Sequence, residues 1–137
     1  MRVREIMSSN LLSLNSTSTV REAAELMFEN DIRHLPIIDG DVLVGIISDR
    51  DLNGYAWSFR NDLTESDNEV PGTRVSQLMH KGVITTDPET DLPEIIETML
   101  SNKIGAVIVT DSVDSSRAIG IVSYEDILRA TKETLQS

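Results

Sequence analysis

Two serine–aspartate pairs of equal spacing carry the residue types that could do chemistry in this chain. Ser48 and Asp51 close the stretch GIISDRD, and Ser123 and Asp126 close the stretch GIVSYED. A serine followed three residues later by an acid is typical of a helix start, where the serine oxygen caps the first turn. The same arrangement offers free N–H groups, a hydroxyl and a carboxylate, which can bind a phosphate and the two hydroxyls of a ribose. The pairs therefore allow a capping role and a ligand-binding role, and one serine can serve both.

A glycine lies three residues before each serine. Gly45 and Gly120 stand in apolar, β-branched surroundings that are typical of a strand. A glycine there lets a flat ring approach the backbone. It can equally be a bulge or a close-packing position. Both interpretations stay open on the sequence.

The elements around the two pairs are repeated, because the chain is an internal duplication. Residues 3–7 match residues 75–79, an offset of 75 − 3 = 72. At this offset the apolar positions of 20–27 fall on those of 92–99, and both sets have the i, i+3, i+4, i+7 spacing of a helix face. Each helix is predicted to begin with a capping box, formed by the residue pairs Thr19–Glu22 and Asp91–Glu94.

Extended runs follow each predicted helix. The first strands are expected at 34–39 and 106–111, and the second strands at 43–47 and 118–122. Turn-forming residues between them predict a hairpin in each half. Closing helices are expected over about 49–59 and 124–135. Each half therefore reads short strand, helix, strand, strand, helix, which predicts an α+β fold.

The duplication divides the chain into three parts. The first repeat is expected at 1–59, an acidic linker at 60–73 and the second repeat at 74–137. A repeat of about 60 residues buries too little surface to be stable alone. The two repeats are therefore expected to share a core, packed through their sheets with approximate twofold symmetry.

Composition narrows the class of function. The 137 residues include no cysteine, which excludes disulfides, a thiolate nucleophile and a cysteine–zinc site. The net charge of −11 argues against nucleic acid and anionic membranes as partners. No apolar run approaches a membrane span and no secretory signal is evident, so a cytoplasmic protein is expected. Phosphate-loop, nucleophile-elbow and calcium-loop motifs are absent, so neither catalysis nor a metal site is expected.

The complete pattern resembles the CBS domain, the family named after the regulatory region of cystathionine β-synthase. The resemblance covers about Val3 to Thr131 in two consecutive copies. Each copy has the early methionine, the first helix, the strand that ends in aspartate and the closing Gly-x-x-Ser-x-x-Asp. The resemblance implies a regulatory pair that binds an adenosine-type ligand in clefts between the repeats. The ligand expected first is AMP, ADP or ATP, and the alternative ligand is S-adenosylmethionine or NAD.

The resemblance also implies roles for individual residues. Asp51 and Asp126 would hold the ribose, and Ser48 and Ser123 would contact ribose or phosphate. The adenine would be gripped in one cleft by Leu11, Leu12, Ile32, Arg33 and His34, and in the other by Val83, Ile84, Ile104, Gly105 and Ala106.

The two clefts are not expected to be equivalent. Arg33 and His34 correspond to Gly105 and Ala106, so only one repeat offers basic residues there. One hypothesis places a ribose at Asp126 and its phosphate near Arg33 and His34. The alternatives are a solvated arginine at a helix end and a partly buried imidazole bonded to backbone. The acidic surroundings would also suit the cationic S-adenosylmethionine.

The expected partners are the ligand, a second copy of the chain and an effector protein that the sequence does not identify. A homodimer is implied by the resemblance, and Trp57 and Phe59 are expected to pack against the other repeat or a second subunit. The alternative function is a purely structural or dimerisation module with no physiological ligand. In that case the serine–aspartate pairs would persist as helix caps.

Overall fold

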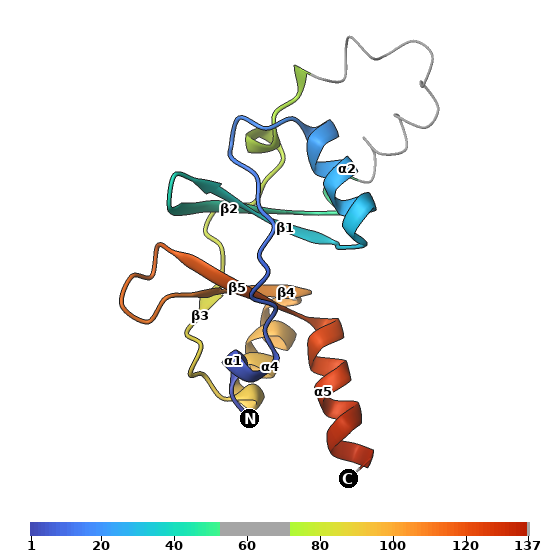
Figure 1. Ribbon diagram of the computed structural model, residues 1–137, viewed down its shortest axis with the longest axis vertical. Coiled ribbons are helices and arrows are strands. Elements are labelled where there is room, and N and C mark those ends of the chain that lie inside the picture. The colour runs from blue at the N-terminus through green and yellow to red at the C-terminus, as the bar shows by residue number, and fades with distance from the viewer. Residues whose placement is uncertain (53–71, 137) are drawn as a thin grey trace. The chain divides into compact units, whose positions relative to one another are not determined.

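The computed structural model describes residues 1–52 and 72–136, and its elements appear in Figure 1. The first half contains α1 (Val3–Ile6), α2 (Val20–Asn30), β1 (His34–Asp39) and β2 (Val42–Ser48). The second half contains the 3-10 turn η2 (Val75–Gln77), β3 (Thr85–Thr86), α4 (Leu92–Asn102), β4 (Ala106–Thr110), β5 (Ala118–Ser123) and α5 (Tyr124–Gln136). This content confirms the predicted α+β class, both hairpins and the last closing helix.

Part of one prediction lies outside the described residues. Turns cover residues 49–52, where the N–H of Leu52 donates to the carbonyl oxygens of Ser48 and Asp49. The rest of the predicted helix to Phe59, with Trp57, and the linker up to residue 71 are not described.

The chain folds into two compact units whose boundaries differ from those of the sequence repeats. One unit is Leu12–Gly82, and the other combines Met1–Leu11 with Val83–Ser137. The short segments that open the two repeats therefore each complete the core of the other half. Val75 is fully buried among Val20 and Ala23 in the first core, and Val3 is fully buried in the second core.

The unit Leu12–Gly82 is a hairpin covered by one helix. β1 and β2 pair antiparallel, with Leu35 opposite Ile47 and both side chains fully buried. α2 begins with the predicted capping box, because Thr19 Oγ1 accepts the N–H of Glu22 at 3.1 Å and Glu22 accepts the N–H of Thr19 at 3.2 Å. Such a cap contributes about 1 kcal/mol to helix stability.

The second unit has a three-stranded sheet in the order β3-β4-β5, with β3 parallel and β5 antiparallel to β4. The capping box predicted at the start of α4 is wrong, since the Asp91 side chain makes no capping hydrogen bond. The N–H of Glu94 donates instead to the carbonyl oxygen of Asp91 at 3.1 Å. Pro93 lies in the first turn, where it has no N–H to satisfy and its φ is already helical, so the turn depends less on a cap.

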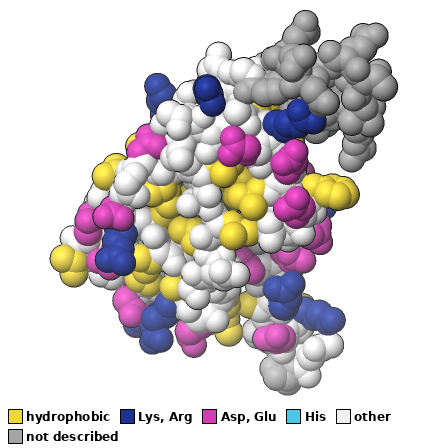
Figure 2. All heavy atoms as spheres, turned by 45° about the horizontal axis from the view of Figure 1, so that its top comes forward, with side chains coloured by type: hydrophobic (Ala, Val, Ile, Leu, Met, Phe, Trp, Pro, Cys, Tyr) yellow, Lys and Arg dark blue, Asp and Glu magenta, His cyan; other side chains and the backbone are white. Residues whose placement is uncertain are grey.

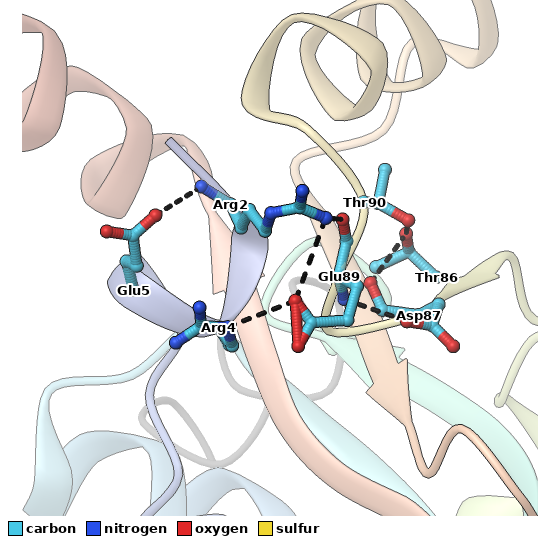
Figure 3. Close-up of polar contacts among 7 residues, drawn as sticks. All are labelled: Arg2, Arg4, Glu5, Thr86, Asp87, Glu89 and Thr90. Atoms are coloured by element: carbon cyan, nitrogen blue, oxygen red, sulfur yellow. Dashed lines mark hydrogen bonds and ion pairs between the residues drawn. The ribbon is translucent and has the colours of Figure 1, made fainter.

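The N-terminal segment is fastened to the loop before α4, as Figure 3 shows. The N–H of Val3 donates to the carbonyl of Thr90 at 2.9 Å. Arg2 donates to the carbonyl of Glu89 at 2.8 Å, and Arg4 pairs with the Glu89 carboxylate at 3.1 Å. These arginines are exposed, so their ion pairs contribute little to stability, and the burial of Val3 stabilises the attachment more.

Each opening segment also extends the sheet of its unit and explains a repeated glycine. His80 exchanges backbone hydrogen bonds with Ile46 at 2.8 and 3.1 Å, and Ser8 does the same with Ile121 at 2.9 and 3.0 Å. A methionine precedes each of these residues and covers the glycine of the neighbouring strand. A Cβ on Gly45 would lie 2.6 Å from Met79 Sδ, and a Cβ on Gly120 would lie 2.9 Å from Met7 Sδ. The structure therefore favours the close-packing role of the two glycines.

No helix in the described ranges is long and apolar enough to cross a bilayer.

Candidate functional site

The Ser48–Asp51 pair closes a hydrogen-bonded ring at the end of β2. Asp51 Oδ2 accepts the Ser48 N–H at 2.8 Å and the Ser48 hydroxyl at 3.0 Å. The N–H of Asp51 donates to Ser48 Oγ at 3.3 Å. These reciprocal bonds confirm the capping role predicted for the pair.

The Ser123–Asp126 pair repeats this geometry at the start of α5. The corresponding distances are 2.8, 3.0 and 3.4 Å. The side chains of Asp51 and Asp126 are 16% and 17% exposed, so neither carboxylate is sealed inside the protein. In both pairs one oxygen, Oδ2, is held by the serine, and the chemistry available to a ligand depends on the other oxygen, Oδ1.

The two Oδ1 atoms have different neighbours. His80 Nε2 lies 2.8 Å from Asp51 Oδ1, a hydrogen-bond distance. Asp126 Oδ1 has the exposed Arg129 Nη1 at 3.8 Å, which is an ion-pair distance and not a hydrogen bond. No site role was predicted for His80 from the sequence. The signal was present, because the offset of 72 places Ser8 at the equivalent position, so the duplication is broken at this residue.

Two of the other predicted residues of the unit Leu12–Gly82, Arg33 and His34, lie at the same end of the hairpin. His34 begins β1 directly opposite Ser48, and the carbonyl of Arg33 accepts the N–H of Asp49 at 2.9 Å. The Arg33 guanidinium is exposed and pairs with the Asp49 carboxylate at 3.1 Å. Leu12 and Ile32 are partly buried and pack against the core of this unit.

The partly buried side chain of His34 has a shifted pKa. Burial lowers the pKa of His34 below 6.5, and the nearby Asp49 and Asp51 carboxylates oppose that shift. The imidazole is therefore held in its neutral form at neutral pH, which weakens its case as a cationic phosphate ligand.

This shift predicts that protein stability falls as the pH drops through about 6.5. Below that pH the unfolded chain protonates His34 while the folded state resists it, so the unfolded state binds more protons. The variant His34→Ala places at position 34 the residue found at its counterpart, Ala106. We expect the free energy of unfolding, measured by urea titration from pH 7.5 to 5.5, to fall less steeply in His34→Ala. Equal slopes in the two proteins would contradict the assignment.

The predicted residues of the other unit occupy matching positions. Ala106 begins β4 opposite Ser123, and the N–H of Tyr124 donates to the carbonyl of Gly105 at 3.1 Å. Ile104 packs against the core of this unit. Val83 and Ile84 are partly buried at the start of its second segment.

Leu11 and Leu12, predicted to act in one cleft, belong to different compact units. Among residues 1–52 and 72–136, no group of three histidine, aspartate or glutamate side chains is placed to hold a metal ion.

Comparison with known proteins gives this arrangement a family. The CBS domain model matches the chain twice, at residues 3–57 and 75–133. The uncharacterized protein MJ1225 of Methanocaldococcus jannaschii is 34% identical over 113 residues, which cover 80% of this chain and 40% of that protein. Across the first curated relatives, the chain spans 24% to 40% of their length.

Two solved structures match over nearly the whole length of both chains. The CBS domain pair of protein MJ0100, in complex with 5-methylthioadenosine and S-adenosyl-L-methionine, has a TM-score of 0.77 at 28% identity, covering 98% of each chain. CBSX2, in complex with AMP, has a TM-score of 0.78 at 26% identity, covering 97% of each chain. Two matched repeats and these neighbours show that the chain belongs to the CBS domain family and folds as a CBS domain pair.

Proposed function

We propose that this chain is a regulatory module that binds an adenosine-type ligand through the serine–aspartate pairs, with AMP, ADP or ATP as the leading ligands. The observation that carries the proposal is the hydrogen bonding of the Asp126 carboxylate. Its Oδ2 is fixed by two bonds from Ser123, while Oδ1, among the described residues, has only Arg129 nearby at 3.8 Å, and the side chain as a whole is 17% exposed. A carboxylate oriented in this way can accept both hydroxyls of a ribose diol without rearrangement.

The ligands of the structural neighbours support the same chemical class. MJ0100 is described with 5-methylthioadenosine and S-adenosyl-L-methionine, and CBSX2 with AMP. These three molecules share an adenosine group and differ in what the 5′ carbon carries. Recognition of ribose by an aspartate would account for the ribose of this shared group, and the control with GMP tests whether the adenine is also recognised.

The charges of the chain bear on which group the 5′ carbon of the ligand carries. Figure 2 shows acidic side chains on several parts of one face, with arginine and lysine side chains between them. Arg33 is exposed and gives up only one surface ion pair if it turns to a phosphate. A guanidinium suits phosphate through paired hydrogen bonds, and this favours the nucleotides over S-adenosylmethionine, which carries no phosphate.

Regulation would follow from linkage. A ligand shifts a conformational equilibrium only by the difference in its affinity for the two states. We propose that the responding assembly is a homodimer read by an effector protein.

The test is ligand-dependent unfolding. The purified protein is titrated with urea alone and with AMP, ATP, NAD or S-adenosylmethionine, with GMP as the control nucleotide. A ligand present at about 100 times its dissociation constant raises the free energy of unfolding by about 2.7 kcal/mol. We expect AMP or ATP to do so and GMP to have a much smaller effect.

The competing function is a structural module without a ligand. One observation favours it: in each serine–aspartate pair the two residues bond to each other within a single turn. If all four adenosine compounds leave the unfolding curve unchanged at millimolar concentration, the structural function replaces the proposed one.

A further inference from the structure

Resting on the proposed function, we propose that His80 is a specificity-determining residue that blocks the ribose site at Asp51, so that Asp126 is the primary ligand site of the chain. The geometry points to this because the Asp51 oxygen that a diol needs is already hydrogen-bonded. His80 Nε2 lies 2.8 Å from Asp51 Oδ1, and Oδ2 is held by Ser48. Both oxygens of this carboxylate are therefore engaged before any ligand arrives.

His80 is well placed for this role by the backbone. His80 lies at the edge of β2, where it exchanges two backbone hydrogen bonds with Ile46. The His80 side chain is 69% exposed and the Asp51 side chain is 16% exposed. An ionised carboxylate only accepts hydrogen bonds, so the imidazole Nε2 is the donor.

The second unit supplies the matched comparison. Ser8 has the same backbone pairing, with Ile121, that His80 has with Ile46. The serine side chain is shorter than the imidazole that His80 carries at the equivalent position. No hydrogen bond from a described residue reaches Asp126 Oδ1, whose nearest cation is the Arg129 guanidinium at 3.8 Å. The difference between His80 and Ser8 thus accompanies an occupied carboxylate at Asp51 and an available one at Asp126.

The effect of His80 on ligand affinity at Asp51 follows from the hydrogen bond that a ribose must displace. To bind at Asp51, a ribose must displace a hydrogen bond to a charged acceptor, which weakens ligand affinity about tenfold or more.

The experiment exchanges the two residues. His80→Ser gives the first unit the residue of the second, and Ser8→His gives the second unit the residue of the first. Calorimetry with AMP is expected to show one dominant site per wild-type chain. In His80→Ser the weaker site should gain about tenfold in affinity, and in Ser8→His the dominant site should lose affinity. His80→Gln, which keeps a donor, should stay closer to wild type than His80→Ser.

The outcomes distinguish failure of the role of His80 from failure of the proposed function. If wild type binds AMP and His80→Ser leaves both the number of sites and their affinities unchanged, the role of His80 is overturned while the proposed function stands. If neither protein binds AMP, ATP, NAD or S-adenosylmethionine, the proposed function fails and the role of His80 fails with it. A ligand-free measurement checks the contact itself: imidazole 15N NMR should report an Nε2–H tautomer in wild type, and its signal should change in Asp51→Asn. An unchanged signal would overturn the contact.

Discussion

Replacement of Asp126 by asparagine is expected to lower the affinity of the chain for AMP about 100-fold, because one charged acceptor of the diol is lost. The asparagine side chain has almost the same shape, and its oxygen can still accept the Ser123 N–H that Asp126 accepts at 2.8 Å. What it lacks is the second carboxylate oxygen and the charge. Hydrogen bonds to ionised groups contribute about 1.5–3 kcal/mol each, so a loss of this size follows from a single such bond. Calorimetry at constant ionic strength measures it.

Two variants control for the loss of charge. Glu125→Gln removes a carboxylate from the neighbouring position of α5, where Glu125 is exposed and pairs only with Arg129 among the described residues. We expect Glu125→Gln to bind AMP like wild type. Asp51→Asn should lower the affinity for AMP less than Asp126→Asn does, because Asp51 is already hydrogen-bonded to His80. If Asp126→Asn binds as tightly as Glu125→Gln, Asp126 does not hold the ribose.

Replacement of Gly120 by alanine is expected to lower the free energy of unfolding by about 2 to 3 kcal/mol. The new Cβ would lie 2.9 Å from Met7 Sδ and 2.9 Å from the carbonyl oxygen of Ser8. The methionine can rotate, but the carbonyl belongs to the backbone and accepts the N–H of Ile121 at 3.0 Å. Moving it away breaks the pairing that fastens the N-terminal segment. This overlap exceeds the gain of about 0.4–1 kcal/mol that alanine brings by restricting the unfolded chain.

Gly72→Ala is the matched control for this prediction. A Cβ on Gly72 would have no heavy atom within 4 Å, and the residue has no positive φ, so the substitution should leave stability within about 0.5 kcal/mol of wild type. Gly45→Ala should fall between the two, because its closest contact is the flexible Met79 Sδ at 2.6 Å and the His80 carbonyl is farther away at 3.1 Å. Urea unfolding of the three variants gives the order. Equal stability of Gly120→Ala and Gly72→Ala would refute the close-packing role.

The elements inside each repeat could be predicted because their signals are local. The hairpins follow from apolar runs joined by turn residues, and the cap at Thr19 follows from Glu22 three residues later. The start of α4 shows the limit of the same rule. Asp91 and Glu94 have the spacing of a capping box, yet Pro93 between them changes what the first turn needs.

The exchange of the opening segments could not be predicted, since it is a choice between two equal partners. Val3 and Val75 hold the same place in the duplicated pattern. Either valine suits either core by size and polarity, and only long-range packing decides that Val3 completes the second core and Val75 the first.

The candidate site, like the fold, could be predicted only where its signals are local. The serine–aspartate rings follow from spacing within one turn. The bond between Asp51 and His80 joins residues 29 apart in sequence. It depends on the strand pairing of His80 with Ile46, which no local pattern indicates.

The pairing of Val75 with one core and Val3 with the other has a consequence for how this protein can be divided. In folding terms the block Leu12–Gly82 is an uninterrupted insertion between Leu11 and Val83. A cut between the duplicated copies would leave each fragment without the valine that its own interior requires. Excision or transplantation at the bonds after residues 11 and 82 would keep both interiors whole.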